Sequence, residues 1–236
     1  TALSLDPIQA AFNISTLIRW LDYNDTWLAA EWGHPSDNIG ALLAVADHLG
    51  RSGQRQITVR ELLSLIIRAY EIQGVIAIDN SFNRVGFDHV LLVKLATCCT
   101  VTALLGGDCE AVAAAASQSL VDTGPLRTYR HAPNTGSRKS WAAGDAAARG
   151  VQLAYLTIRG EPGYPLAVEA ERWGFDAVLL RGKSLRCGEL GSHIIEHVLF
   201  KVDFPAEFHA QTAAEAAIAL HPQVRARLNQ VERIDI

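Results

Sequence analysis

Apolar residues recur at a spacing of three and four along most of the chain, and this pattern limits the possible folds more than any other feature. Such spacing is typical of helices that bury one face. The pattern predicts helices over residues 7–21, 36–50, 58–70, 89–105, 108–120, 140–158, 191–200 and 210–220. A chain built from so many helical segments is expected to be all-α.

Capping residues mark several of the expected helix ends. Pro7 suits the first turn of a helix, and Ser36 and Asp108 are typical N-caps. Thr58 followed by Glu61 has the spacing of a capping box. These signals place the helix starts independently of the apolar pattern.

Strand signals are scarce. Residues 177–180 form a short apolar run that fits a strand or a helix, and residues 231–236 alternate weakly. The 236 residues suffice for one domain, or for one domain with a small appendage. We therefore expect a helical domain over residues 1–230 and a possible first strand of a second domain over residues 231–236.

The composition excludes several classes of protein. The formal net charge is −4, which argues against a nucleic-acid-binding protein, and no apolar run is long enough to cross a bilayer. The N-terminal residues lack the basic and apolar regions of a secretory signal, so a cytoplasmic location is expected. The four cysteines lack the spacing of a zinc or iron–sulfur site and are expected to be reduced core thiols.

Polar residues interrupt the helical pattern at residues 21–36. Asp22, Asp25 and Thr26 follow one expected helix, and His34 precedes the next. Asp and His side chains in such loops can act as general acids or bases. The alternative is that the aspartates are turn residues and that His34 only precedes a structural proline.

A second polar segment covers residues 80–89 and ends at His89, where a helix is expected to begin. The positive end of a helix dipole disfavours an imidazolium there, which keeps the ring neutral and able to act as a base. A capping or surface histidine is the alternative.

The third polar segment, residues 127–139, is strongly basic. Its positive side chains are Arg127, Arg130, Arg138 and Lys139, with His131 among them, and no Asp or Glu occurs from residue 123 to residue 144. Guanidinium groups beside a helix start can bind carboxylates. The segment predicts a site for a small anion, and the alternative is a solvated basic face.

The three segments resemble sequences of the MmgE/PrpD family. The matching stretches are Asp6–Ile14, Ile18–Asn38, Asn80–Gly86, Leu126–Gly144 and Phe204–His209. The resemblance covers essentially the whole chain and implies a large helical domain, here without its first helices. The smaller α/β lid domain of the family would be missing or barely begun at the C-terminus.

The resemblance also implies site residues. Family members that decarboxylate cis-aconitate use an Asp, a Thr, two His and a Lys, and the matching positions here are Asp22, Thr26, His34, His89 and Lys139. His89 matches less closely than the others because its flanking residues differ. The expected substrate-binding residues are Arg84, Arg130, His131 and Arg138. No metal and no cofactor are expected.

The activity that the resemblance implies is dehydration of 2-methylcitrate to 2-methyl-cis-aconitate in propionate catabolism. A base, His89 or Asp22, would remove a proton next to a carboxylate, and an acid, His34 or His131, would protonate the departing hydroxyl. The substrate would be a small tricarboxylate and the assembly a homodimer. The alternatives are a polycarboxylate decarboxylase or epimerase of the same family, or a non-catalytic helical module.

Overall fold

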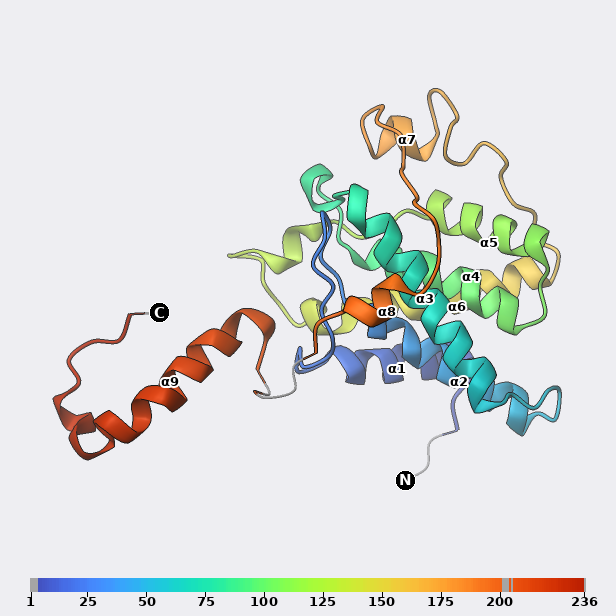
Figure 1. Cartoon of the computed structure of the whole chain (residues 1–236). Coiled ribbons are helices and arrows are strands. Elements are labelled where there is room, and N and C mark those ends of the chain that lie inside the picture. The colour runs from blue at the N-terminus through green and yellow to red at the C-terminus, as the bar shows by residue number, and fades with distance from the viewer. Residues whose placement is uncertain (1–3, 201–203, 205, 236) are drawn as a thin grey trace.

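The computed structural model describes residues 4–200, 204 and 206–235, and every regular element among them is helical (Figure 1). The α-helices are α1 (Pro7–Arg19), α2 (Ile39–Arg51), α3 (Val59–Asp79), α4 (Val90–Leu104), α5 (Cys109–Val121), α6 (Arg138–Ile158), α7 (Phe175–Val178), α8 (His193–His197) and α9 (Gln211–Val224). Short 3-10 helices cover Pro35–Asn38, Asn83–Val85, Arg127–Arg130, Phe208–Ala210 and Arg225–Gln230. The all-α prediction is confirmed.

Helix α4 forms the centre of the domain. All of its residues except Ala103 are buried, because it is apolar on every side rather than on one stripe. Helices α3, α5 and α6 pack around it, while α1 and α2 pack against α6 and against each other (Figure 1). The polar segments at the N-terminal ends of α2, α4 and α6 therefore belong to one compact body.

Glycine allows α6 to approach its two neighbours closely. A Cβ atom at Gly144 would lie 2.5 Å from the carbonyl oxygen of Phe12 on α1, and one at Gly150 would lie 2.8 Å from the carbonyl oxygen of Lys94 on α4. Both positions need a residue without a side chain. The close packing at Gly144 brings the start of α6 next to the end of α1.

The capping predictions hold at two helices. Asp108 accepts a hydrogen bond from the amide of Ala111, and Thr58 accepts one from the amide of Glu61. The prediction is wrong at Ser36, whose hydroxyl lies in a 3-10 turn and binds Asp25 instead of capping α2. Residues 175–178 form helix α7, so the strand reading of the 177–180 run is wrong.

The C-terminal part runs away from the helical body. Helix α9 is exposed along its length and projects to one side in Figure 1. Residues 231–235 have no regular structure and residue 236 lies outside the described residues, so the first strand of a lid domain stays a prediction. The division into residues 1–230 and 231–236 also stays a prediction.

None of the helices in the described ranges has the length and apolar character needed to span a membrane. The four cysteines are all free thiols, but only Cys98 and Cys99 are buried. Cys109 and Cys187 are exposed, so the prediction that all four belong to the core is wrong for these two.

Candidate active site

Lys139 and Asp22 meet where α1 ends and α6 begins. The Nζ atom of Lys139 lies 3.4 Å from Oδ2 of Asp22, and Arg19 pairs with the other carboxylate oxygen of Asp22. Asp22 has a φ of 61°, a left-handed conformation that turns the chain sharply after α1. The structure thus brings the first and third polar segments together.

His34 is oriented by the backbone of its own segment. Its Nδ1 atom lies 2.6 Å from the carbonyl oxygen of Asp25, and because a carbonyl only accepts, Nδ1 carries the hydrogen. This hydrogen bond assigns the lone pair of the neutral ring to Nε2. The Asp25 carboxylate is itself buried and accepts a hydrogen bond from the amide of Ser36 at 3.2 Å.

His89 lies beside His34, with 5.7 Å between the ring centroids. Burial, together with the nearby guanidinium groups, lowers the pKa of His89 to about 3 even though Asp88 opposes the shift. The ring is therefore neutral near pH 7. Its Nε2 atom is buried and has no hydrogen-bond partner among the residues that the structure describes.

Asp88 links His89 to the basic segment. Its Oδ1 atom lies 3.4 Å from Nδ1 of His89, and Arg130 donates to both of its oxygens. Burial alone would raise the pKa of Asp88, but the neighbouring His89 and Arg130 hold it well below its usual range. Asp88 is thus a buried carboxylate whose charge is balanced by Arg130.

Arg19 and Asp37 are buried charged residues of the candidate site that were not predicted from the sequence. Arg19 is 4% exposed, and its Nε atom lies 4.0 Å from Oδ2 of the fully buried Asp37. Burial raises the pKa of Asp37 to about 7, although Arg19 opposes the shift. A signal for Arg19 exists in the sequence, since it shares a face of α1 with the small buried residues Ala11 and Ser15 at a spacing of four.

Thr26 is held by backbone pairing with a distant segment. Its amide donates to the carbonyl oxygen of Leu199 at 2.8 Å, and its own carbonyl accepts from the Leu199 amide at 2.9 Å. The Thr26 hydroxyl oxygen is buried and has no hydrogen-bond partner within the described ranges.

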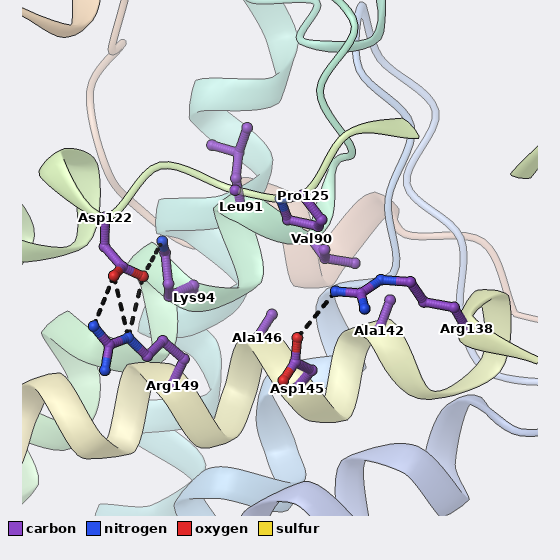
Figure 2. Close-up of a pocket in the computed structure, with 11 residues that line it drawn as sticks. Val90, Leu91, Lys94, Asp122, Pro125, Arg138, Ala142, Asp145, Ala146 and Arg149 are labelled. Atoms are coloured by element: carbon purple, nitrogen blue, oxygen red, sulfur yellow. Dashed lines mark hydrogen bonds and ion pairs between the residues drawn. The ribbon is translucent and has the colours of Figure 1, made fainter. Parts of the chain in front are cut away.

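The cations of the third segment do not all point to one place. Arg130 reaches the buried cluster, while Arg127 lies 3.7 Å from the buried carboxylate of Glu31. Figure 2 shows Arg138 directed toward Asp145 on α6, at the wall of a hollow of about 210 Å³ that Lys94 and Arg149 also line. Arg138 also stacks on the rings of Tyr129 and Trp141.

The two remaining predicted substrate-binding residues are exposed. His131 follows the 3-10 helix Arg127–Arg130, and Arg84 lines a separate cavity next to Asn80 and Leu180. The buried cluster therefore contains only Arg130 of the four. The roles of Arg84, His131 and Arg138 stay predictions.

The chemistry of the cluster is that of an acid–base site with fixed positive charges. The neutral imidazole of His89 can accept a proton, and Arg19, Arg130 and Lys139 can stabilise negative charge that develops on a ligand. Within the described ranges, no group of three or more His, Cys, Asp or Glu side chains is placed to hold a metal ion.

Comparison with known proteins gives relatives over nearly the whole chain. Residues 1–188 match the MmgE/PrpD N-terminal domain. The chain is 57% identical over 231 residues to the 2-methylcitrate dehydratase of Escherichia coli K12, which covers 96% of this chain and 48% of the relative. Identity is 54% over 226 residues with the 2-methylcitrate dehydratase of Cupriavidus necator, covering 94% of this chain and 47% of the relative.

A mitochondrial 2-methylcitrate dehydratase of Yarrowia lipolytica is 55% identical over 231 residues, covering 95% of this chain and 44% of the relative. The chain spans about half the length of the curated relatives it matches.

Proposed function

The chain belongs to the MmgE/PrpD family, and from this premise we propose that the protein is a 2-methylcitrate dehydratase that forms 2-methyl-cis-aconitate without a cofactor. The names of the relatives support the substrate, and the contact between His34 and His89, whose lowered pKa keeps its own ring neutral, is the observation that carries the chemistry. A tricarboxylate could pair with Arg130 and Lys139, which already hold carboxylates in the protein.

The base in this proposal is His89. Burial and three nearby arginines lower its pKa, and a bound tricarboxylate would offset those positive charges. Binding of the substrate therefore makes the ring more basic when a base is needed. Its Nε2 atom has no hydrogen-bond partner in the described part of the chain and can take the proton from the carbon next to a carboxylate.

The positive groups stabilise the charge that this step creates. Removal of the proton shifts negative charge onto the neighbouring carboxylate, and donors fixed near that carboxylate lower the barrier by roughly 3 kcal/mol each. Lys139 and Arg130 are the candidates. Each is held by a carboxylate, Asp22 and Asp88 respectively, and so is oriented before the substrate arrives.

The other predicted residues have supporting roles. Asp22 is flanked by Arg19 and Lys139, which makes it a positioning group for Lys139 rather than a strong base. The buried Thr26 hydroxyl is a donor for a substrate oxygen. His34 is placed next to His89 to take part in proton transfer.

The test is turnover of 2-methylcitrate by the full-length protein, followed by the absorbance of the conjugated alkene product. We expect His89→Ala and Lys139→Ala each to lower kcat by about 100-fold or more. Arg51→Ala is the matched control, because Arg51 is 80% exposed at the far end of α2. Turnover within threefold of wild type in both site variants would contradict the proposed roles.

The homodimer and the cytoplasmic location are part of the same proposal. Two large apolar side chains near the end of α1, Leu17 and Trp20, are 73% and 52% exposed. Exposed apolar groups of this size are common at subunit interfaces. Analytical ultracentrifugation of the full-length protein tests the dimer, and a single monomeric species would contradict it.

A further inference from the structure

A segment far along the chain returns to the candidate active site. The ring of His209 stacks on the ring of Trp32 with 5.2 Å between centroids and 28° between planes. Trp32 lies two residues before His34, in a turn closed by two hydrogen bonds between the backbones of Trp27 and Gly33. His209 is thereby held at the side of the loop that carries His34.

Glu207 fixes the orientation of His209. One carboxylate oxygen of Glu207 lies 2.9 Å from Nδ1 of His209, and the other accepts the His209 amide at 2.8 Å. With Nδ1 directed at the carboxylate, Nε2 is the nitrogen that faces away from it. The His209 side chain is 60% exposed, so this nitrogen is accessible to a small molecule.

The charges around Glu207 connect this pair to the Asp22–Lys139 contact. Burial would raise the pKa of Glu207, but hydrogen bonds from His209 and the positive charge of Lys139 lower it overall. The Glu207 carboxylate also acts on the buried Arg19. The same two cations that flank Asp22 therefore lie within electrostatic reach of Glu207.

We propose that Glu207 and His209 form the acid dyad of the dehydration, an inference that rests on the proposed function. The base takes a proton from the substrate, and that C–H electron pair forms the double bond. The C–O bond breaks, its electron pair goes to the departing hydroxyl, and Nε2 of His209 supplies the proton that makes it water. Glu207 orients the His209 ring for this transfer; afterwards the base releases its proton to solvent and His209 takes one up from solvent.

The contrast between the histidines supports this division of roles. His89 is buried among arginines and is neutral, which suits a base, whereas Nδ1 of the exposed His209 is hydrogen-bonded to a carboxylate that orients the ring. His131, one of the two acid candidates from the sequence, has no Asp or Glu within the eight residues before it and the thirteen after it.

The test uses His209→Ala in the full-length protein with 2-methylcitrate as substrate. We expect kcat to fall by about 100-fold with KM within threefold of wild type, and added imidazole to restore at least about 10-fold of the loss. Glu207→Gln is expected to lower kcat by about 10-fold, because the ring remains but loses its negative partner. His221→Ala, at an exposed histidine on α9, is the matched control.

The outcomes separate a failure of the proposed function from a failure of the dyad. If the wild-type protein does not dehydrate 2-methylcitrate, the proposed function and the dyad are both overturned. If it does, and His209→Ala retains more than a third of kcat, or loses activity that imidazole does not restore, only the dyad is overturned. Circular dichroism checks folding, and His209→Gln is judged by the same kcat criterion, without imidazole, should His209→Ala not fold.

Discussion

Helix α4 contacts two groups of ionic residues, and they differ in whether all of their buried polar atoms have hydrogen-bond partners. At its N-terminus, His89 lies among Asp88, Arg130 and Arg19, with a buried nitrogen that has no partner among the described residues. One turn further on, Lys94 is 4% exposed but contacts Asp122 at 2.8 Å and the carbonyl oxygen of Thr123.

In the second group, each charged side chain has a partner of opposite charge. Arg149 donates to both oxygens of Asp122, at 2.7 Å and 3.2 Å, so the carboxylate holds two cations (Figure 2). Burial of a charge is tolerated when such partners are present. From this comparison we propose that the fully paired group supports the structure and that the group around His89 takes part in the proposed chemistry.

The two groups are connected by the loop after α5. Lys94 holds the carbonyl of Thr123, whose φ of 51° is a left-handed conformation, and two residues later the Pro125 carbonyl accepts the amide of Asp88 at 2.9 Å. The matched group thus fixes the loop that positions the site.

The largest effect is expected from Asp88→Ala, because it leaves the buried Arg130 without its carboxylate. We expect a loss of about 3–5 kcal/mol in the free energy of unfolding, measured with urea, and loss of turnover. Asp47→Ala, which breaks an exposed pair with Arg51, is the control and is expected to change stability by less than about 0.5 kcal/mol. Equal effects of the two substitutions would contradict the structural role of Asp88.

Lys94→Met is expected to cost less, about 1–2 kcal/mol, since Asp122 keeps Arg149 as a partner and only the bonds from Lys94 are lost. Turnover should fall by a few fold through the shifted loop. Urea unfolding and kcat measure the two effects. A loss of turnover as large as that of His89→Ala would indicate that Lys94 takes part in catalysis, and the two groups would then not differ in role.

A pH series isolates the contribution of His89. Its pKa is about 3 when folded and about 6.5 when unfolded, so the unfolded state binds a proton first and wild-type stability falls as the pH drops below 6.5. Asp37, with its folded pKa raised to about 7, acts in the opposite direction in this range.

His89→Gln retains Asp37 and removes only the histidine term. When the pH falls from 6.5 to 5.5, the free energy of unfolding of wild type should therefore fall by about 1 kcal/mol relative to that of the variant. Urea unfolding at the two pH values measures this difference, with His221→Gln as the control. An equal change in both proteins, or a larger loss in the variant, would show that His89 is not buried in its neutral form.

The smallest effect is expected from Arg138→Gln. Arg138 is paired with Asp145 and stacked on two aromatic rings at the hollow of Figure 2, so we expect KM to rise by less than threefold. Steady-state kinetics with 2-methylcitrate test this. A tenfold increase in KM would instead place Arg138 in the substrate site, as the sequence predicts.

The helices were predictable because the signals that start and end them are local. The apolar pattern and the caps at Thr58 and Asp108 act within a few residues and need no tertiary contact. The prediction failed at Ser36, where a distant carboxylate, Asp25, competes for the hydroxyl. The local sequence around Ser36 cannot predict that competition, because Asp25 is brought there by the tertiary fold.

The amino-acid pattern alone was enough to predict a helical chain whose polar segments carry Asp22, His34, His89 and Lys139. The pairing of the charges became visible only in the folded chain, where Arg130 pairs with Asp88 inside the cluster and Arg138 pairs with Asp145 outside it. Helix formation depends on neighbours along the chain, whereas the state of a charge depends on burial and on partners that folding brings from elsewhere.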